Sequence, residues 1–278
     1  MNKLSFVASM LMMCLSMTMM AQKNGAKALD KPDPNFQIYL CFGQSNMEGN
    51  AAIEDIDRTG VNPRFMAMYA VDDVKVGWKK GLWHTAVPPQ TRPSTGLTPV
   101  DYFGRKMVDN LPDSIKVGTI TVAVGGASID LFDKRTCKAY LKKQPDWMKN
   151  FASQYHGNPY ARLIELGKIA KKQGVIKGIL LHQGETNNGD ANWPNRVKTV
   201  YNDILKDLNL KAEDVPLLVG ETVQKDQGGS CWQHIAVVDD IAKTIPTAHV
   251  ISSKGCPQRG DGLHFIAESY RTMGKRYA

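Results

Sequence analysis

The sequence contains little cysteine, and its five cysteines in 278 residues form no metal-binding or redox motif. It has no C-x-x-C pair and no Cys/His spacing of the zinc-site type. Cys41 lies inside an apolar run and is expected to be a buried free thiol. Cys231 and Cys256 both lie near glycines and are candidates for a disulfide. We therefore expect no metal and no other cofactor.

The sequence also lacks the patterns of nucleic-acid and nucleotide binding. Its formal net charge is +8, but the basic residues are scattered and form no stripe interleaved with aromatics. No G-x-G-x-x-G motif or phosphate loop follows the first predicted strand, which argues against a flavodoxin-like cofactor binder. Nucleic acid is therefore not an expected partner.

Beyond the N-terminus, no apolar segment is long enough to span a membrane. Residues 1–21 contain Lys3, a short apolar run and a final alanine, which is the layout of a secretory signal peptide. Lipidation at Cys14 is an alternative, although bulky Met13 precedes it. We expect residues 22–278 to form a single domain, exported to the periplasm or the extracellular space, without a membrane span.

Apolar runs alternate with segments of helical periodicity along this domain. This alternation predicts an α/β fold with a mostly parallel sheet covered by helices on both faces. The predicted strands are 37–42, 64–71, 117–124, 176–181, 215–220 and 249–252. The predicted helices are 100–110, 161–173, 196–208, 234–245 and 266–276. Segments 72–98 and 131–158 are predicted to be long loops, which often form the walls of functional sites.

Polar and Gly-rich segments follow several of the predicted strands. In an open parallel sheet, ligands bind outside the carboxyl ends of the strands, so these segments are expected to meet in one site. They are "CFGQSNMEGN" (41–50), "GGAS" (125–128), "HQGET" (182–186) and, near the C-terminus, "GDGLHF" (260–265).

Ser45 is the candidate nucleophile in the first of these segments. It directly follows a strand, where free backbone N–H groups at a helix start can stabilise an anion, although a serine there can also simply cap the helix. The segment lacks the second glycine of the G-x-S-x-G elbow, which argues against an α/β-hydrolase. Ser128 and Ser230 are rival nucleophiles that do not directly follow a strand. Gln44 and Asn46 flank Ser45 and are expected to bind substrate.

A serine nucleophile needs a general base, a partner for that base and donors for the oxyanion. Asp261 and His264 are separated by three positions, so one turn can place the carboxylate on the imidazole, although Asp261 can instead cap the last helix. Glu185 is an alternative support for the histidine. Gln183 points to the same side of an extended chain as Glu185, and its amide is a candidate oxyanion donor.

Two further features bear on substrate binding. Gly125 and Gly126 allow a close backbone approach, and one of their N–H groups is a candidate oxyanion donor, although a tight turn is the commoner reason for such a pair. The tryptophans considered for a sugar platform are Trp83, Trp193 and Trp232, with packing as the alternative.

Taken together, "FGQSNMEG", "GGASI", "HQGE" and "DGLHF" resemble the signature blocks of the SGNH-hydrolase superfamily, in its branch of carbohydrate acetylesterases. That branch includes sialate O-acetylesterases and acetylxylan esterases of carbohydrate esterase family 6. The resemblance spans almost the whole predicted domain and implies a three-layer α/β/α fold of flavodoxin type. It also implies Ser45 as nucleophile, His264 as base with Asp261 as its partner, and an oxyanion hole of Ser45, Gly125 or Gly126, and Gln183. Glu185 is implied to lie in the site.

The expected function is that of an exported serine esterase that removes O-acetyl groups from carbohydrates through an acyl-enzyme. A lipid or other small-ester GDSL-type esterase and a non-catalytic carbohydrate-binding protein are the alternatives. The acetylated sugar stays open between xylan and sialic acid. Sialate would require a cation for its carboxylate, and the candidates are Arg92, Arg135 and Arg259.

Overall fold

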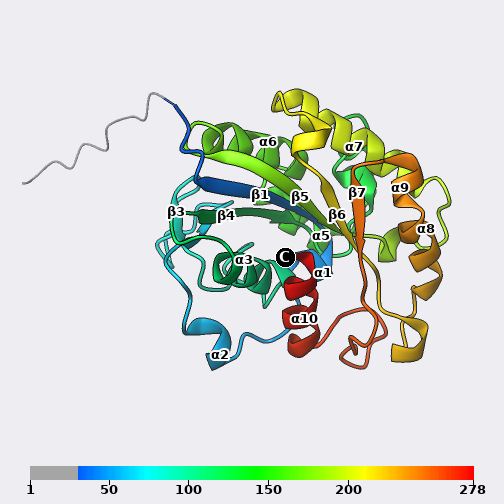
Figure 1. The fold of residues 1–278 in the computed structure, drawn as a ribbon. Helices are drawn as coiled ribbons and strands as arrows, with labels where there is room; N and C mark the ends of the chain where they lie inside the picture. Colours follow the sequence, from blue (N-terminus) through cyan, green and yellow to red (C-terminus); the bar gives the residue numbers. More distant parts are fainter. Residues whose placement is uncertain (1–30) are drawn as a thin grey trace, which may run out of the picture.

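The structure is a computed structural model that describes residues 31–278. A seven-stranded sheet in the order β3-β2-β4-β1-β5-β6-β7 forms its centre, and helices cover both faces (Figure 1). Every neighbouring pair is parallel except β2 with β3, so the predicted α/β fold is confirmed. The strands are β1 Phe36–Gly43, β2 Phe65–Met68, β3 Trp83–Thr85, β4 Lys116–Ala123, β5 Val175–His182, β6 Leu217–Gly220 and β7 Ala248–Ile251.

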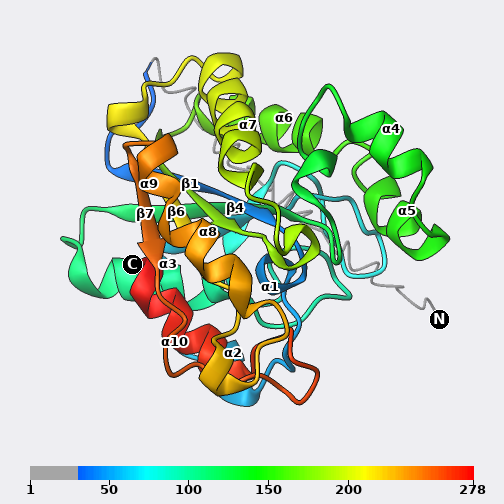
Figure 2. The ribbon, with the colours of Figure 1, turned by 90° about the vertical axis from the view of Figure 1, so that its right-hand side faces the viewer.

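The helices form two layers, with α6 and α7 on one face of the sheet and α3 and α10 on the other (Figures 1 and 2). Four of the five predicted helices agree with the structure to within a few residues, but segment 234–245 is divided into α8 and α9. Segment 131–158, predicted as a loop, contains α4 and α5. The helices are α1 Ser45–Glu48, α2 Asp55–Arg58, α3 Pro99–Asn110, α4 Cys137–Lys142, α5 Asp146–Ser153, α6 Pro159–Ala170, α7 Trp193–Asp207, α8 Ile235–Asp239, α9 Ile241–Thr244 and α10 Ala267–Tyr277.

Strand β1 lies at the middle of the sheet because both of its faces are apolar. Ile38, Leu40 and Phe42 pack into the core beneath α6 and α7. Tyr39 and Cys41, on the alternate positions, pack into the core beneath α3 and α10. A strand that is apolar on both faces is stable only between two helical layers, as the parallel-sheet prediction requires.

The strand order brings three carboxyl ends together. The five parallel strands β4-β1-β5-β6-β7 follow the strand order of flavodoxin-type sheets, and β2 and β3 extend the sheet beyond β4. Gly43, the last residue of β1, is in register with Ala123 of β4 and with His182 of β5. Gly43 has φ +153°, and a Cβ atom there would lie 2.1 Å from the His182 carbonyl oxygen. A glycine is therefore required where β1 passes into the Ser45 segment.

The cysteines and the surface charges complete the comparison with the sequence. Cys41 is buried and free, as predicted, and burial raises the pKa of its thiol. The proposed disulfide is wrong, because Cys231 and Cys256 are both free and contact different partners, the Glu185 carbonyl and Arg276 respectively.

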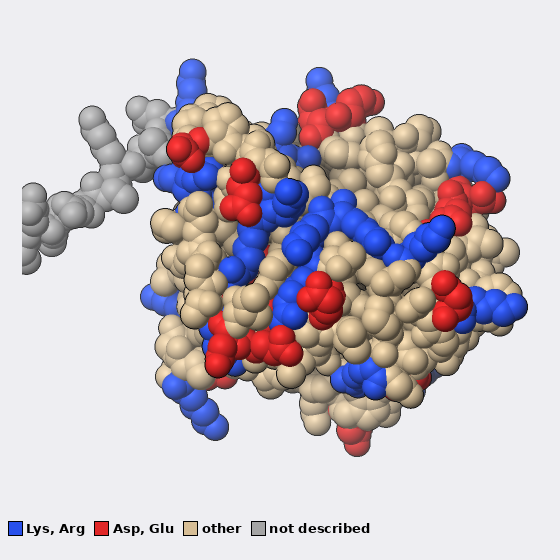
Figure 3. All heavy atoms as spheres, turned by 60° about the horizontal axis from the view of Figure 1, so that its bottom comes forward, with Lys and Arg blue, Asp and Glu red and all other residues tan. Residues whose placement is uncertain are grey.

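Lys and Arg side chains intermingle with Asp and Glu on the face drawn in Figure 3. None of the helices in residues 31–278 has the length and apolarity needed to cross a membrane.

Asp101 near the start of α3 is a fully buried carboxyl group with two hydrogen-bond donors. It accepts the Thr98 backbone N–H at 2.9 Å through Oδ2 and the Gln90 side-chain amide at 2.5 Å through Oδ1. Burial raises the pKa of Asp101 to about 7, although these hydrogen bonds act in the opposite direction. The folded protein therefore keeps a proton that the unfolded chain releases above about pH 4.

We expect Asp101→Asn to lower the free energy of unfolding by about 1–3 kcal/mol at pH 5. The amide nitrogen of asparagine cannot accept a hydrogen bond, so one of the two buried donors, at Thr98 or at Gln90, loses its acceptor. The raised pKa makes the wild type lose stability as pH rises from about 4 to about 7, and the variant lacks this contribution. The difference between the two proteins should therefore shrink with pH, which urea unfolding at pH 5 and pH 8 measures. A difference that grows with pH would contradict this assignment.

Candidate active site

Three predicted catalytic side chains form one hydrogen-bonded chain at the carboxyl edge of the sheet. Ser45 is the first residue of α1, one residue after the end of β1, while Asp261 and His264 lie in the loop between β7 and α10. Ser45 Oγ lies 2.8 Å from His264 Nε2, and Asp261 Oδ2 lies 2.8 Å from His264 Nδ1. This is the geometry in which an imidazole takes a proton from a serine while a carboxylate orients it.

Asp261 is held rigidly by its own loop. Its Oδ1 accepts the backbone N–H groups of Leu263 at 2.9 Å and of His264 at 2.8 Å. Arg259 donates its Nε–H to Oδ2 at 2.8 Å. Burial alone would raise the pKa of Asp261, but the hydrogen bonds from His264, Arg259 and Leu263 outweigh it and hold the pKa well below its usual range. The carboxylate therefore stays ionised throughout the neutral pH range.

Glu185, the alternative partner of the histidine, has a different set of contacts. Its Oε1 accepts the side-chain amide of Asn46 at 2.6 Å, and its Oε2 is buried without a hydrogen-bond partner among residues 31–278. Burial raises the pKa of Glu185, with smaller opposing contributions from hydrogen bonds and from the charge of His264. The structure thus gives Asp261, not Glu185, as the hydrogen-bond partner of His264.

Asn46 is a structural bridge, contrary to the prediction that it binds substrate. It is fully buried, and its amide donates to Glu185 and, at 2.9 Å, to the Leu263 carbonyl oxygen. Its carbonyl oxygen accepts the Tyr270 hydroxyl of α10 at 2.6 Å. Every polar atom of the side chain is therefore occupied in joining α1 to the histidine loop and to α10.

Gln183 does not reach the site that the sequence predicted for it. The side chain is fully buried, and its amide nitrogen lies within hydrogen-bond distance of Asn187 Oδ1 at 2.7 Å, Gln44 Oε1 at 3.1 Å and the Ala127 carbonyl oxygen at 3.3 Å. Its Oε1 accepts the indole N–H of Trp193. An oxyanion donor must point at the reacting carbonyl, and this amide is already committed to the interior.

The two glycines of the "GGAS" segment also differ in their availability. Gly125 donates its backbone N–H to Glu48 Oε1 at 2.9 Å, so that group is not free to bind an oxyanion. Gly126 lines the same cavity as Ser45 and His264, and its N–H makes no hydrogen bond within the described part of the chain. The sequence could not separate these two neighbours, because the acceptor that engages Gly125 comes from α1.

A cavity of about 470 Å³ opens over the serine. Ser45, His264, Gln44 and Gly126 line it together with two aromatic residues of α5, Trp147 and Phe151. A volume of this size accommodates a small ligand of one or a few rings. No group of three or more His, Cys, Asp and Glu side chains in residues 31–278 is arranged to hold a metal ion.

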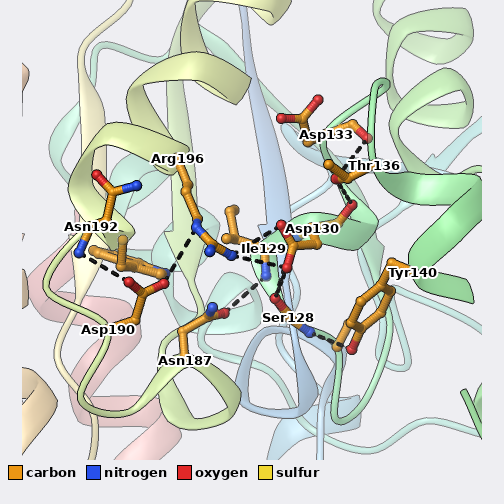
Figure 4. A network of polar contacts seen from close by, with 12 residues as sticks. Ser128, Ile129, Asp130, Asp133, Thr136, Tyr140, Asn187, Asp190, Asn192 and Arg196 are labelled. Carbon is orange, nitrogen blue, oxygen red and sulfur yellow. Dashed lines mark hydrogen bonds and ion pairs between the residues drawn. The ribbon is translucent and has the colours of Figure 1, made fainter. Parts of the chain in front are cut away.

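A polar network fixes the loop that carries the glycines (Figure 4). Asn187 accepts both the Gln183 amide and, at 3.0 Å, the Ile129 backbone N–H, which joins the loops after β5 and β4. Ser128 caps the following turn through the Asp130 backbone N–H at 3.2 Å. This capping contact accounts for Ser128, one of the rival nucleophiles, as a structural residue.

The site also contains a buried ion pair that the sequence did not predict. Glu48 in α1 binds the guanidinium of Arg92, a side chain that is only 1% exposed. Arg92 also donates to the Ala123 carbonyl oxygen at 3.0 Å, and its guanidinium lies 4.8 Å from the centre of the Phe151 ring. A buried ion pair of this kind joins the serine segment to the end of β4 beneath the cavity.

We expect Glu48→Gln to lower the free energy of unfolding by about 3–5 kcal/mol, because it leaves the buried guanidinium of Arg92 without its counter-charge. Lys243→Gln is the matched control, since Lys243 pairs with Asp240 on the surface at 2.7 Å. Loss of that pair should change stability by less than about 0.5 kcal/mol. Urea unfolding compares the two variants, and equal small losses would show that the Arg92 pair is not needed.

The tryptophans suggested as a sugar platform lie elsewhere. Trp193 is fully buried, Trp83 bonds Gln173 through its indole N–H at 2.6 Å, and Trp232 stacks under Lys225 at 4.5 Å. None of the three is among the residues that line the cavity. The aromatic wall of the cavity comes instead from α5, a helix that the sequence did not predict.

The three-layer fold carries a hydrogen-bonded serine, histidine and aspartate at the carboxyl edge of its sheet, which is the arrangement of a serine hydrolase. Residues 35–278 match the family described as "Carbohydrate esterase, sialic acid-specific acetylesterase". The chain belongs to this family, which confirms the resemblance seen in the sequence.

The relatives of known structure share this fold. A probable carbohydrate esterase of Arabidopsis thaliana, At4g34215, is 22% identical over 265 residues, covering 88% of this chain and 90% of that protein. Its X-ray structure gives a TM-score of 0.63 at 20% identity over 88% of this chain and 97% of that one. The crystal structure of NanS gives a TM-score of 0.62 at 16% identity, over 89% of this chain and 96% of that one. The crystal structure of a carbohydrate acetylesterase of Xanthomonas citri gives a TM-score of 0.58 at 17% identity, over 87% of this chain and 54% of that one.

Proposed function

We propose that this chain is an exported carbohydrate O-acetylesterase that works through an acyl-enzyme on Ser45. The observation that carries the proposal is the chain Ser45–His264–Asp261, which has 2.8 Å between each pair and opens into a 470 Å³ cavity. The family supplies the class of substrate, an acetylated carbohydrate. The signal peptide that the sequence predicts for residues 1–21 lies outside the described residues, so export is part of the proposal.

In the proposed mechanism, His264 Nε2 takes the proton of Ser45 as its Oγ attacks the acetyl carbonyl carbon. The negative charge of Asp261 stabilises the imidazolium that forms. His264 then passes the proton to the sugar oxygen as the ester bond breaks, which leaves an acetyl group on Ser45. A water molecule that loses its proton to the same histidine attacks the acetyl-serine, and acetate leaves as Ser45 recovers its proton.

For the oxyanion, we propose the backbone N–H groups of Ser45 and Gly126 with the side-chain amide of Gln44. Gln44 Oε1 faces three donors, the Gln183 amide and the backbone N–H groups of Gly184 and Thr186, at 3.1–3.4 Å. This fixes the orientation of the amide and leaves its nitrogen on the side of the cavity that Gln44 lines. In this proposal Gln183 does not contact the reacting carbonyl itself but orients Gln44, which does.

Two alternatives make different predictions. A non-catalytic carbohydrate-binding protein would not need a serine, an imidazole and a carboxylate in mutual hydrogen-bond distance. A lipid esterase would use a long apolar channel for the acyl chain, whereas polar groups of Gln44, Glu48 and Arg92 contribute to this cavity.

The test is acetate release by the wild-type protein from acetylated xylo-oligosaccharides and from O-acetylated sialic acid, beside p-nitrophenyl acetate and p-nitrophenyl octanoate. We expect acetate from at least one sugar ester, and faster hydrolysis of the acetate than of the octanoate. Hydrolysis of the octanoate in preference to every acetyl ester would favour the lipid esterase. No hydrolysis of any ester would favour the binding protein.

A further inference from the structure

Trp147 in α5 is a large apolar side chain that is 48% exposed and lines the cavity over Ser45. An exposed aromatic face inside a concave site is typical of a ligand-binding surface and has no role in the core. We propose that Trp147 is the platform on which the ring of a neutral acetylated sugar lies while its ester reaches Ser45. This inference rests on the proposed function and names the kind of sugar that the site accepts.

The indole is held next to the oxyanion loop by two contacts. Its ring contacts Phe151 edge-on, with 5.9 Å between the ring centres, and Phe151 in turn lies against the guanidinium of Arg92. The edge of the indole also lies close to Gly126, where an added Cβ atom would lie 2.7 Å from Trp147 Cη2. A sugar whose acetyl oxygen meets the Gly126 N–H must therefore extend over or beside the indole.

The surroundings of the indole match the two kinds of surface on a pyranose ring. One face of such a ring presents C–H groups, which an indole face binds well, while its edge presents hydroxyl groups that need hydrogen-bond partners. Asn50, Ser94, Thr95 and Thr186 line the same cavity. The hydroxyls of Thr95 and Thr186 already donate to the carbonyl oxygens of Arg92 and Gly126, so the side chains of Asn50 and Ser94 are the ones left to supply such partners. A fatty acyl chain or a flat aromatic ester would form no hydrogen bond with these two side chains.

The charges in the cavity favour a neutral sugar over an acidic one. Arg92 is the one Lys or Arg side chain among the residues that line the cavity, and its guanidinium is 1% exposed and paired with Glu48. Arg259, beside the histidine, already donates to Asp261 at 2.8 Å and to the Asn50 carbonyl oxygen at 2.9 Å. Arg135 pairs with Asp133 and Asp203 outside the cavity.

A sugar carboxylate would thus enter a cavity without a free cation and would meet the carboxyl groups of Glu48 and Glu185. Desolvation of an unpaired carboxylate is costly, so acidic sugars should bind much more weakly than neutral ones. The family description names sialic acid, but the cations that the sequence offered for sialate are each engaged in other contacts within this chain.

The platform is tested with Trp147→Ala and Trp147→Phe on two substrates, an acetylated xylo-oligosaccharide and p-nitrophenyl acetate. We expect Trp147→Ala to raise KM for the oligosaccharide about tenfold, equivalent to about 1.4 kcal/mol of binding, and Trp147→Phe to retain most of the affinity. For p-nitrophenyl acetate, which has no sugar ring, the loss in kcat/KM should be several-fold smaller than the loss for the oligosaccharide. Trp232→Ala, at a 37% exposed tryptophan outside the cavity, is the matched control and should match the wild type.

Equal losses on both substrates, or no loss on the oligosaccharide, would overturn the platform. Neutral-sugar selectivity is measured by kcat/KM of the wild type on the oligosaccharide and on O-acetylated sialic acid, where we expect at least tenfold in favour of the neutral sugar. Equal or faster hydrolysis of the sialic acid ester would overturn it. Calorimetric binding of the oligosaccharide to Ser45→Ala, with and without Trp147→Ala, measures the contribution of the platform without turnover. Failure of the esterase proposal is recognised separately, by absence of hydrolysis of every ester by the wild type.

Discussion

Replacement of Ser45 by alanine is expected to reduce kcat for acetyl ester hydrolysis by roughly 10⁴- to 10⁶-fold, with little change in substrate binding. The reason is geometric, because Ser45 Oγ is the atom that lies 2.8 Å from His264 Nε2 and faces the cavity. Without it, the donors at Ser45 and Gly126 still polarise a bound ester, but no acyl-enzyme forms. Acetate release under saturating substrate measures the loss, and mass spectrometry of the quenched wild type detects the acetyl-serine.

Ser128→Ala is the matched control for this variant. Ser128 follows the glycines of the same site, but its hydroxyl caps a turn at Asp130, so we expect a small stability loss of about 1 kcal/mol and an activity within a few fold of wild type. Thermal unfolding should show that both alanine variants are folded. Activity that survives Ser45→Ala, or that is lost in Ser128→Ala without loss of structure, would remove Ser45 as the nucleophile.

Asp261→Asn is expected to lower kcat on the order of 10⁴-fold, because an amide in this position favours the wrong tautomer of the histidine and cannot stabilise its positive form. The pKa of Asp261 is held well below its usual range, so the carboxylate remains charged at every pH where the protein is assayed. A loss of activity on mild acidification of the wild type would therefore have to come from another group. Steady-state kinetics at pH 7 on p-nitrophenyl acetate measures the effect.

Glu185→Gln separates the two carboxylates. In the wild type, Glu185 Oε1 accepts the Asn46 amide at 2.6 Å, and the substitution keeps an oxygen that can make this hydrogen bond. The new NH₂ group takes the place of Oε2, which is buried without a partner in the described chain. We expect a fall in kcat of less than about tenfold, in line with a positioning role and far below the Asp261→Asn effect. If Glu185→Gln abolished activity and Asp261→Asn preserved it, the assignment of the histidine partner would be reversed.

The residues closest to the chemistry could be predicted because their signals are local. Ser45 directly follows a strand that is apolar on both faces, and the Asp261–His264 spacing fits one turn; the structure brings all three together. In a parallel sheet, the carboxyl ends of adjacent strands meet, so segments far apart in sequence could be assigned to one edge without knowledge of the strand order.

The oxyanion donors could not be assigned in the same way, because availability depends on partners from elsewhere in the chain. Gln183 has the right chemistry and stands at the right strand end, but Asn187, Gln44 and Trp193 engage its amide in the interior. Gly125 loses its N–H to Glu48, which is 77 positions away. A motif shows which groups a segment carries, and only the packing shows which of them remain free.

The aromatic wall was missed for a different reason. Segment 131–158 is rich in charged and polar residues, and its two helices are short, so their periodicity is weak. Trp147 gains its importance from the position of α5 beside Gly126, a tertiary contact for which the sequence has no pattern.

The bridge made by Asn46 links hydrolysis to the completeness of folding. Ser45 and His264 are 219 positions apart, and Asn46 holds their two segments together through Leu263 and through Tyr270 of α10. No fragment that contains only one end of the chain carries both the nucleophile and its base, and a molecule in which α10 has separated loses a contact that holds them in register. The hydrolytic rate of a sample is therefore proportional to its fraction of fully native molecules. Heat or denaturant should abolish hydrolysis in the same cooperative transition that unfolds the sheet.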